Sequence, residues 1–411
     1  MSVLTFREAT LPNGLRVIAE INPKAKSTAL GYFVRTGSRD ELAGEEGVSH
    51  FLEHMVFKGT ERRSAWDVNR EFDEMGAKYN AFTNEELTVF YGAVLPEFAP
   101  RLLDLLSDLM RPALREEEFE TERKVILDEI ALYRDRPHFV LYERAQEAYF
   151  GRHPLAKPVL GTTESIEAMT RAQMAAYHTR RYVPNNMTLA LAGNLDWDEM
   201  LVLAERMTRG WTQGPAPRNH PGFTSEPRRL RTPYDKASQA YGVFMAPGYA
   251  AAAEERYAAR VLAEVLGDPD NGRLFWRLVD PGLVETAVAY HHEFEELGVY
   301  LVYVQGDPAH EEEVSERIRG ELARLEKEGV DGEELERAKL KTATSLVFAG
   351  ETSLSRLFYL GLGYSYTGRY EALDTLRRWV MHLEPYHLGE LLETRPFSRA
   401  LEYWLVPADH G

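Results

Sequence analysis

The sequence contains no cysteine among its 411 residues. Disulfide bonds, thiolate metal sites and cysteine nucleophiles are therefore excluded, and any metal ligand must be a His, Asp or Glu side chain. No apolar run reaches the roughly 18 residues that a membrane-spanning helix needs. The first residues also lack the basic segment followed by an apolar one that marks a secretory signal. We therefore expect a protein of the cytoplasm without a membrane span.

Basic residues are in the minority. The chain has 48 Lys and Arg against 65 Asp and Glu, which gives a formal net charge of -17. A nucleic-acid-binding protein usually carries a basic face, so we expect no nucleic-acid partner. The hydrophobic content of 44% is ordinary for a globular protein.

The length and one segment of unusual composition predict two domains. A chain of this length exceeds what a single hydrophobic core usually serves. Residues 212–233 are rich in Pro, Gly and Arg and show no apolar periodicity, as is typical of a connection between domains. We predict an N-terminal domain over residues 1–215, a linker over 216–233 and a C-terminal domain over 234–411.

The two halves resemble each other. Residues 87–123 align without a gap on residues 301–337, so that Gly92 falls on Gly306 and Glu97 on Glu311. The pattern of expected strands and helices also matches. The predicted fold class is α+β, with two structurally similar α/β domains related by internal duplication and antiparallel-rich mixed sheets flanked by helices.

Local patterns predict the elements of the first half. Asn13-Gly14 between two apolar runs is a strong hairpin signal. A strand is expected over residues 28–35 and a strand pair over 79–95. Helices are expected over residues 47–58, 97–110 and 116–135, the last of which ends before Pro137.

One expected helix carries His50-Phe51-Leu52-Glu53-His54. His50 and His54 are one helical turn apart and lie on the same face, with Glu53 on the same side. Five apolar residues of this helix centre on the opposite side: Val48, Phe51, Leu52, Met55 and Val56. The helix can therefore bury its apolar side and present the three polar residues to a cleft.

This spacing is the inverted form of the zinc signature His-Glu-x-x-His. A catalytic zinc ion needs three protein ligands, an open position for water and a nearby carboxylate that is not a ligand. The bound ion lowers the pKa of its water to roughly 7, and the carboxylate accepts the proton during attack on a carbonyl. Glu53 is the candidate for that base. The alternative is that His50 and His54 are two solvated residues on an ordinary amphipathic helix.

A third ligand is expected from the helix over residues 116–135. Glu122 and Glu129 are seven residues apart and share a face, so either could reach the metal. Each could equally be a solvated surface residue, which is the usual position of Glu. In the second half Glu122 corresponds to Glu336, whereas Glu129 corresponds to Ala343. Shared architecture would explain Glu122 but not Glu129.

Together these motifs resemble the pitrilysin and insulysin family of zinc peptidases, and within it the mitochondrial processing-peptidase β-subunit type and its bacterial homologues. The first half carries most of the resemblance, and the second half matches mainly in layout. The matching segments are HFLEHMVFKGT at residues 50–60, NAFT at 80–83, ERKVILDE at 122–129, HPL at 153–155 with GT at 161–162, and YVPNNM at 182–187.

The resemblance implies a role for each residue of the site. His50, His54 and Glu129 would bind one zinc ion per chain, and Glu53 would be the general base that activates zinc-bound water. Glu122 would be a carboxylate that orients one of the ligands. The C-terminal domain would have the same fold without metal ligands.

The resemblance also implies a substrate-binding strand, to which an extended peptide would add by backbone pairing. Its residues are Asn80, Ala81, Phe82 and Thr83. Such pairing depends on the conformation of the peptide more than on its side chains, so broad specificity would follow. From the residues alone, a plain edge strand beside a turn is the simpler interpretation.

Members of this family assemble two duplicated units into a chamber, and the second unit usually supplies an Arg and, seven residues later, a Tyr near the scissile carbonyl. Arg277 matches the Arg, but Val284 stands at the Tyr position and cannot donate a hydrogen bond. Losing one such donor typically slows a reaction by about 10²–10³-fold. We therefore predict a heterodimer with a related zinc-less chain that carries the Arg/Tyr pair, with a homodimer as the alternative.

The resemblance favours a zinc endopeptidase subunit that hydrolyses extended peptides inside a two-subunit chamber. The first alternative is a catalytically silent structural subunit of the same fold, like the core proteins of a respiratory complex. The second is a metallohydrolase of small molecules that uses the same three polar residues.

Overall fold

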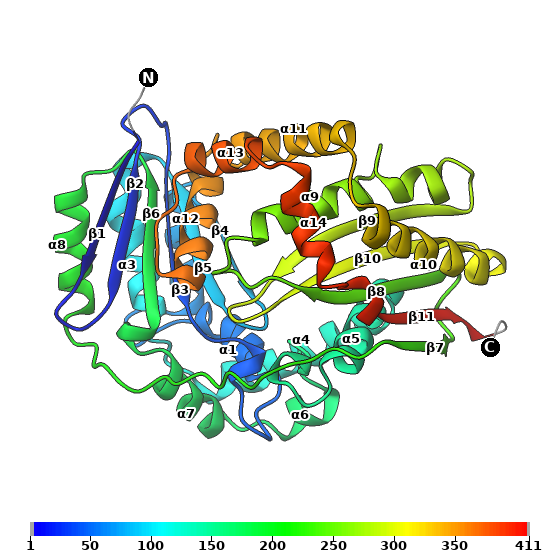
Figure 1. Cartoon of the computed structure of the whole chain (residues 1–411). Coiled ribbons are helices and arrows are strands. Elements are labelled where there is room, and N and C mark those ends of the chain that lie inside the picture. Colours follow the sequence, from blue (N-terminus) through cyan, green and yellow to red (C-terminus); the bar gives the residue numbers. More distant parts are fainter. Residues whose placement is uncertain (1–3, 409–411) are drawn as a thin grey trace. The chain divides into compact units, whose positions relative to one another are not determined.

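The computed structural model describes residues 4–408, which form two compact units (Figure 1). The first unit comprises the residues up to Ile130 together with Lys157–Asn219 and Ala349–Glu371. The second comprises Ala131–Ala156, His220–Phe348 and the residues from Ala372 on. Within residues 4–408 no helix combines the length and the apolar character that crossing a membrane requires.

The first unit is built on a six-stranded sheet in the order β1-β2-β6-β3-β5-β4. Only β2 and β6 pair in parallel, and the remaining neighbours are antiparallel. The hairpin predicted at Asn13-Gly14 is confirmed, because Gly14 lies in the turn between β1 and β2 at φ 85°. The strands are β1 Thr5–Thr10, β2 Arg16–Ile21, β3 Thr28–Val34, β4 Lys78–Thr83, β5 Thr88–Val94 and β6 Met187–Gly193.

The second unit repeats this plan with a five-stranded sheet in the order β7-β11-β8-β10-β9. Here β7 and β11 are the parallel pair, as β2 and β6 are in the first sheet. The order β2-β6-β3-β5-β4 in the first sheet therefore corresponds to β7-β11-β8-β10-β9 in the second. The predicted fold class of two duplicated α/β units with antiparallel-rich sheets is confirmed. The strands are β7 Arg228–Tyr234, β8 Ala240–Gly248, β9 Val284–Glu293, β10 Gly298–Gly306 and β11 Leu401–Pro407.

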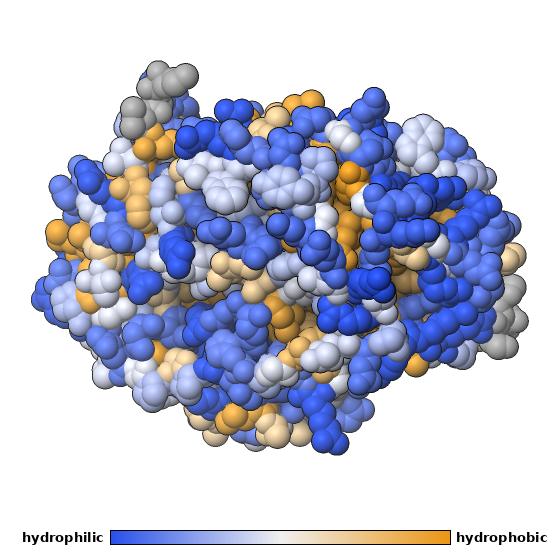
Figure 2. All heavy atoms as spheres, viewed as in Figure 1, coloured by the Kyte–Doolittle hydropathy of each residue, from blue (hydrophilic) through white to orange (hydrophobic). Residues whose placement is uncertain are grey.

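The three helices predicted in the first half agree with the structure to within two residues at each end. They are α1 Val48–Val56, α3 Ala99–Leu109 and α4 Glu116–Arg134. With α2 Ala65–Glu74, α7 Arg171–Arg181 and α8 Trp197–Thr208 they enclose one core of the first unit. In the second unit the core on one side of the sheet includes residues of α9 Arg256–Gly267, α10 Glu311–Glu328, α11 Gly332–Phe348, α13 Leu373–Met381 and α14 Pro385–Glu393. The face in Figure 2 is mostly polar, with apolar residues in small separate patches.

The second core of each unit uses a helix from the other half of the sequence. α12 Ser353–Thr367 packs on β2, β3 and β6 of the first sheet (Figure 1). Leu357, Leu360 and Phe33 belong to the buried cluster between them. α5 Pro137–Phe150 packs in the same way on β8 and β11 of the second sheet. The compact units therefore cross the predicted domain limits at residues 215 and 234, and that division stays a prediction. Residues 228–233, predicted as part of the linker, form most of β7.

A buried ion pair fastens α12 to the first sheet. The Arg356 guanidinium donates to the Glu20 carboxylate on β2, and the Tyr370 hydroxyl donates to the same carboxylate at 2.8 Å.

An Arg356→Met variant should lose about 3–5 kcal/mol of unfolding free energy, because it leaves the Glu20 charge buried without its cation. Urea unfolding measures this loss. Arg369→Met, which removes an exposed arginine two residues after α12, should change it little, and an equal loss in both variants would contradict the assignment.

Candidate metal centre

α1 is oriented by a buried carboxylate rather than by its own first residue. Gly47, at φ 90°, precedes the helix and has no side chain to cap it. The carboxyl oxygens of Glu41 instead accept the N–H groups of Gly47 and Ser49, both at 2.9 Å. The apolar side of α1 is buried as predicted, so His50, Glu53 and His54 lie on its other side.

Glu41 makes the stability of this helix dependent on pH. Burial raises the pKa of Glu41 to about 8, although the N–H groups of Ser49 and Gly47 lower it. The folded protein therefore holds this proton more tightly than the unfolded chain. The stabilisation is complete below the ordinary value of 4.5 and is lost as the pH rises to about 8.

The variant Glu41→Gln cannot ionise at this position. Between about pH 5 and 8 its free energy of unfolding should therefore fall by a few kcal/mol less than that of the wild type. Urea unfolding at several pH values measures both slopes, and equal slopes would refute this role.

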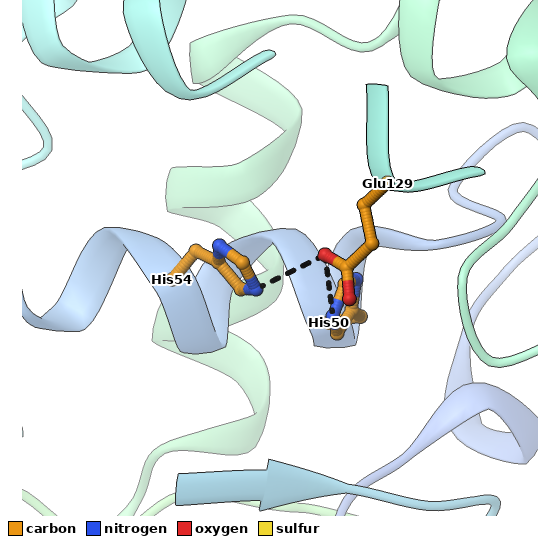
Figure 3. A group of neighbouring side chains, drawn as sticks. All are labelled: His50, His54 and Glu129. Carbon is orange, nitrogen blue, oxygen red and sulfur yellow. Dashed lines mark ion pairs between the residues drawn. The ribbon is translucent and has the colours of Figure 1, made fainter. Parts of the chain in front are cut away.

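Three potential ligands converge from α1 and α4. The Nε2 atoms of His50 and His54 lie 3.7 and 3.6 Å from Oε2 of Glu129. One ligand atom from each of the three side chains lies within 4.8 Å of the others. Figure 3 shows the Glu129 carboxylate reaching toward both imidazoles of α1. Of the two glutamates that the sequence left open, Glu129 is the one that faces both rings.

These donors fit a zinc ion. Separations of 3.6–3.7 Å are too long for hydrogen bonds, but ligand atoms about 2.0–2.1 Å from one tetrahedral ion lie roughly 3.4 Å apart. Nδ1 of His54 is 2.9 Å from a carboxylate oxygen of Glu122. That acceptor places a proton on Nδ1, so in the neutral ring the Nε2 lone pair faces Glu129. Burial lowers the pKa of His50 to about 3, so its imidazole is neutral at pH 7.

Glu122 is a buried carboxylate behind the ligands. Besides His54 it binds the ammonium group of Lys58 at 2.6 Å. Burial alone would raise the pKa of Glu122, but the hydrogen bonds to His54 and Lys58 hold it below its ordinary value. An ionised Glu122 keeps His54 in the tautomer and orientation that a metal ligand needs.

A Glu122→Gln variant should bind zinc about 10–100-fold more weakly, because an amide orients His54 less firmly than a carboxylate does. Competition with a chromophoric chelator measures the affinity. Glu120→Gln, two residues earlier on α4 at an exposed position, is the matched control and should bind zinc like the wild type. Equal affinities in all three proteins would show that Glu122 does not position the ligand.

Glu53 lies beside the three donors but is not one of them. One of its carboxylate oxygens accepts the hydroxyl of Thr83 at 2.6 Å. Burial raises the pKa of Glu53 above its ordinary value, while the Thr83 hydrogen bond lowers it. A carboxylate with a raised pKa accepts a proton more readily at neutral pH. The position therefore suits a base.

Thr83 ends β4, which also contains Asn80, Ala81 and Phe82. In the sheet order β4 is at the edge, and among residues 4–408 its only strand partner is β5. Within these residues no strand pairs with the side of β4 away from β5.

Arg277 belongs to the second unit. It lies in the helical turn Phe275–Val279, where its Nε donates to Glu321 at 3.2 Å. Val284 begins β9 and is buried in the core of that unit. The position predicted for a tyrosine therefore holds an apolar core residue.

In the second unit the helices equivalent to α1 and α4 are α9 and α11. A small cavity there is lined by Glu264, Asp268 and Lys341. The Lys341 ammonium forms an ion pair with Asp268, and burial, with the adjacent Asp268, raises the pKa of Glu264 to about 7. The lining of the cavity beside α9 and α11 therefore includes one ammonium group and two carboxyl groups. The cluster on α1 and α4 consists instead of two imidazoles and one carboxylate.

Two residues of the metal centre escaped the sequence reasoning. Lys58 follows His54 by four residues and lies just after the end of α1, so the spacing within the helix predicted over residues 47–58 could have indicated its contact with Glu122. Glu41 lies in the loop before α1, and no local pattern marks it as the cap of that helix.

Two related α/β units, one of which carries His-x-x-Glu-His beside a distant Glu, define the class of inverted-motif zinc peptidases. Residues 16–163 match the insulinase domain of peptidase family M16, and residues 168–342 match the peptidase M16 inactive domain. The chain belongs to this family.

Curated relatives of this chain are named zinc proteases. A protein of Bacillus subtilis named an uncharacterized zinc protease is 32% identical over 90% of this chain and 91% of its own length. Another of that description, from Mycobacterium tuberculosis, is 34% identical over 92% of this chain and 88% of its own. These relatives match nearly the whole chain, which supports a protease family rather than one shared motif.

Solved structures show the same fold at low sequence identity. A protease from Helicobacter pylori superposes with a TM-score of 0.90 at 21% identity, covering 98% of this chain and all of that one (100%). A chain of complex III from Candida albicans superposes with a TM-score of 0.84 at 19% identity, covering 97% of this chain and 95% of that one. One fold therefore occurs both in a protease and in complex III, and a role has to be argued from the residues of the site.

Proposed function

We propose that this chain is the catalytic subunit of a zinc-dependent endopeptidase that hydrolyses extended peptides. His50, His54 and Glu129 would hold one zinc ion per chain. The observation that carries the proposal is the convergence of these three donors beside Glu53, a carboxylate that takes no part in the cluster. Three protein ligands and one adjacent base are what metal-assisted hydrolysis of a carbonyl requires.

Each residue has a defined part in the proposed reaction. When bound, the zinc ion would supply the positive charge that polarises the scissile carbonyl. Glu53 would take a proton from the attacking water and pass it to the leaving amine. The Thr83 hydroxyl holds the Glu53 carboxylate in place, and Glu122 holds His54.

The edge of β4 is the proposed substrate-binding strand. An extended peptide would pair with the backbone of Asn80, Ala81, Phe82 and Thr83. Because Thr83 also contacts Glu53, a peptide paired along β4 would pass the base at the end of the strand. Backbone pairing favours unfolded or extended substrates over particular side chains.

A partner subunit is part of the proposal. Val284 cannot donate the hydrogen bond that the family's second unit usually supplies, so we propose a heterodimer with a related zinc-less chain in which Arg and Tyr are both present. Arg277 is the local remnant of that pair. A homodimer is the second candidate. The cytoplasm remains the proposed compartment, on the sequence features alone.

A catalytically silent structural subunit is the alternative function. It is supported by the same fold in a chain of complex III and by Val284. The three donors and Glu53 support the peptidase instead, because a structural subunit has no need to keep a set of ligands around a base.

The proposal is tested by offering the zinc-loaded full chain two classes of substrate. We expect cleavage of internally quenched, unfolded peptides and no cleavage of short esters, either by the chain alone or after adding a related chain with the Arg/Tyr pair. Cleavage of esters without cleavage of peptides would point to a small-molecule hydrolase and contradict the role of β4.

A further inference from the structure

A second group of potential metal ligands lies in the second unit, apart from the residues described above. Its members are His220, Glu295 and Glu296, and one ligand atom from each lies within 4.8 Å of the others. Nδ1 of His220 already contacts a carboxylate oxygen of Glu296. Two carboxylates and one imidazole therefore share a single point of the surface.

The two glutamates are presented by a short turn. β9 ends at Glu293 and β10 begins at Gly298, and the backbone N–H of Phe294 donates to the carbonyl of Leu297 at 2.8 Å. Glu295 and Glu296 occupy the two central positions of this hairpin turn. Their backbone is thus held by the sheet, and little ordering would be needed to bring both carboxylates to one ion.

The segment that carries His220 packs through Phe223. Phe223, three residues later, packs its ring against Tyr149, Phe150 and His153 with centroids 5.1–5.7 Å apart. Phe150 also packs against Phe294 of the turn. The segment that carries His220 and the turn that carries the glutamates therefore rest on one aromatic cluster.

A buried histidine lies next to one of the carboxylates. The N–H of Leu155 donates to Nδ1 of His153 at 3.3 Å, so the neutral ring carries its proton on Nε2. That Nε2 faces a carboxylate oxygen of Glu296 at 3.6 Å, and the His153 side chain is only 3% exposed.

We propose that His220, Glu295 and Glu296 form a second site for a divalent cation in this chain. One imidazole nitrogen with two carboxylate oxygens suits first-row cations such as Zn²⁺, Co²⁺ or Mn²⁺ better than Ca²⁺, which prefers an all-oxygen shell. The His220 side chain is 42% exposed and that of Glu296 is 22% exposed, so water can complete the coordination shell. The more exposed site binds zinc more weakly than the one on α1 and α4.

A cation at this site cross-links His220 to the turn between β9 and β10, which lies more than 70 residues later in the sequence. Because the unfolded chain does not hold these three donors together, the bound cation stabilises the folded unit. This role is independent of the proposed peptidase activity.

The test is a zinc titration of the metal-free full chain, with bound zinc determined by elemental analysis after dialysis. We expect two equivalents in the wild type and one in His220→Ala. A His50→Ala/His54→Ala double variant should keep one weaker equivalent, which disappears when Glu296→Gln is added. His382→Ala, which removes an exposed histidine directly after α13 in the same unit, should keep two equivalents.

A second readout does not depend on stoichiometry. Zinc should raise the melting temperature of the His50→Ala/His54→Ala variant, and His220→Ala should abolish that shift. A single equivalent in the wild type, or two equivalents in His220→Ala, would overturn the proposal. Because neither measurement uses hydrolysis, a failure here leaves the peptidase proposal untouched.

Discussion

Replacing Glu53 by Gln is expected to lower kcat for peptide hydrolysis by about 10²–10⁴-fold while leaving the bound zinc unchanged. The amide has nearly the same shape and can still accept the Thr83 hydroxyl, which lies 2.6 Å from the carboxylate in the wild type. It cannot accept a proton from water. The loss should therefore appear in kcat rather than in KM, since the substrate-binding strand is unaltered.

Glu61→Gln is the matched control for this variant, because it makes the same chemical change at an exposed position in the same unit. It should hydrolyse peptides at the wild-type rate. If Glu53→Gln kept full activity with its zinc in place, the proton acceptor would have to be another group. If it lost its zinc, Glu53 would be a ligand and not the base.

Replacing Glu129 by Ala is expected to weaken zinc binding by more than about 100-fold, beyond the change typical of residues that only orient a ligand. His50 and His54 alone would then hold the ion, and the carboxylate that faces both rings at 3.6–3.7 Å would be gone. Peptide hydrolysis should fall in parallel, because the base has no metal-polarised carbonyl to assist. Chelator competition and the quenched-peptide assay measure the two losses on the same sample.

Asp128→Ala provides the control one position earlier on α4, where the side chain is exposed. It should keep both the zinc affinity and the activity. Tight zinc binding by Glu129→Ala would mean that another residue is the third ligand, with Glu122 as the nearest carboxylate to His54.

Local signals in the sequence were sufficient for much of the fold. An Asn-Gly pair defines its own turn geometry, and the apolar spacing of α1 matches the helical period over nine residues. The packing of α12 on the first sheet and of α5 on the second had no such signal, because the local pattern of a helix does not say which sheet it packs against. Residues 228–233 are predicted as linker because their segment is rich in Pro, Gly and Arg and shows no apolar periodicity, and they become part of β7 by pairing with β11.

The proposed site was predictable to the extent that helical spacing and the internal repeat carry information. Spacing placed His50, Glu53 and His54 together, and comparison with the second half distinguished Glu129 from Glu122. Neither could show that Glu122 binds Nδ1 of His54 rather than facing both imidazoles. That distinction depends on how α4 packs against α1, which is a tertiary contact between residues 68 positions apart.

The central claim is that a zinc ion held by His50, His54 and Glu129 makes this chain a peptidase. The most direct measurement is a zinc titration of the metal-free protein while the hydrolysis of a quenched, unfolded peptide is followed. We predict that hydrolysis rises with the first, tightest equivalent, then levels off, and is abolished by a chelator. Full occupancy of that equivalent without hydrolysis of any peptide, both for the chain alone and with an added Arg/Tyr-bearing partner, would contradict the claim and identify the chain as a structural member of its family.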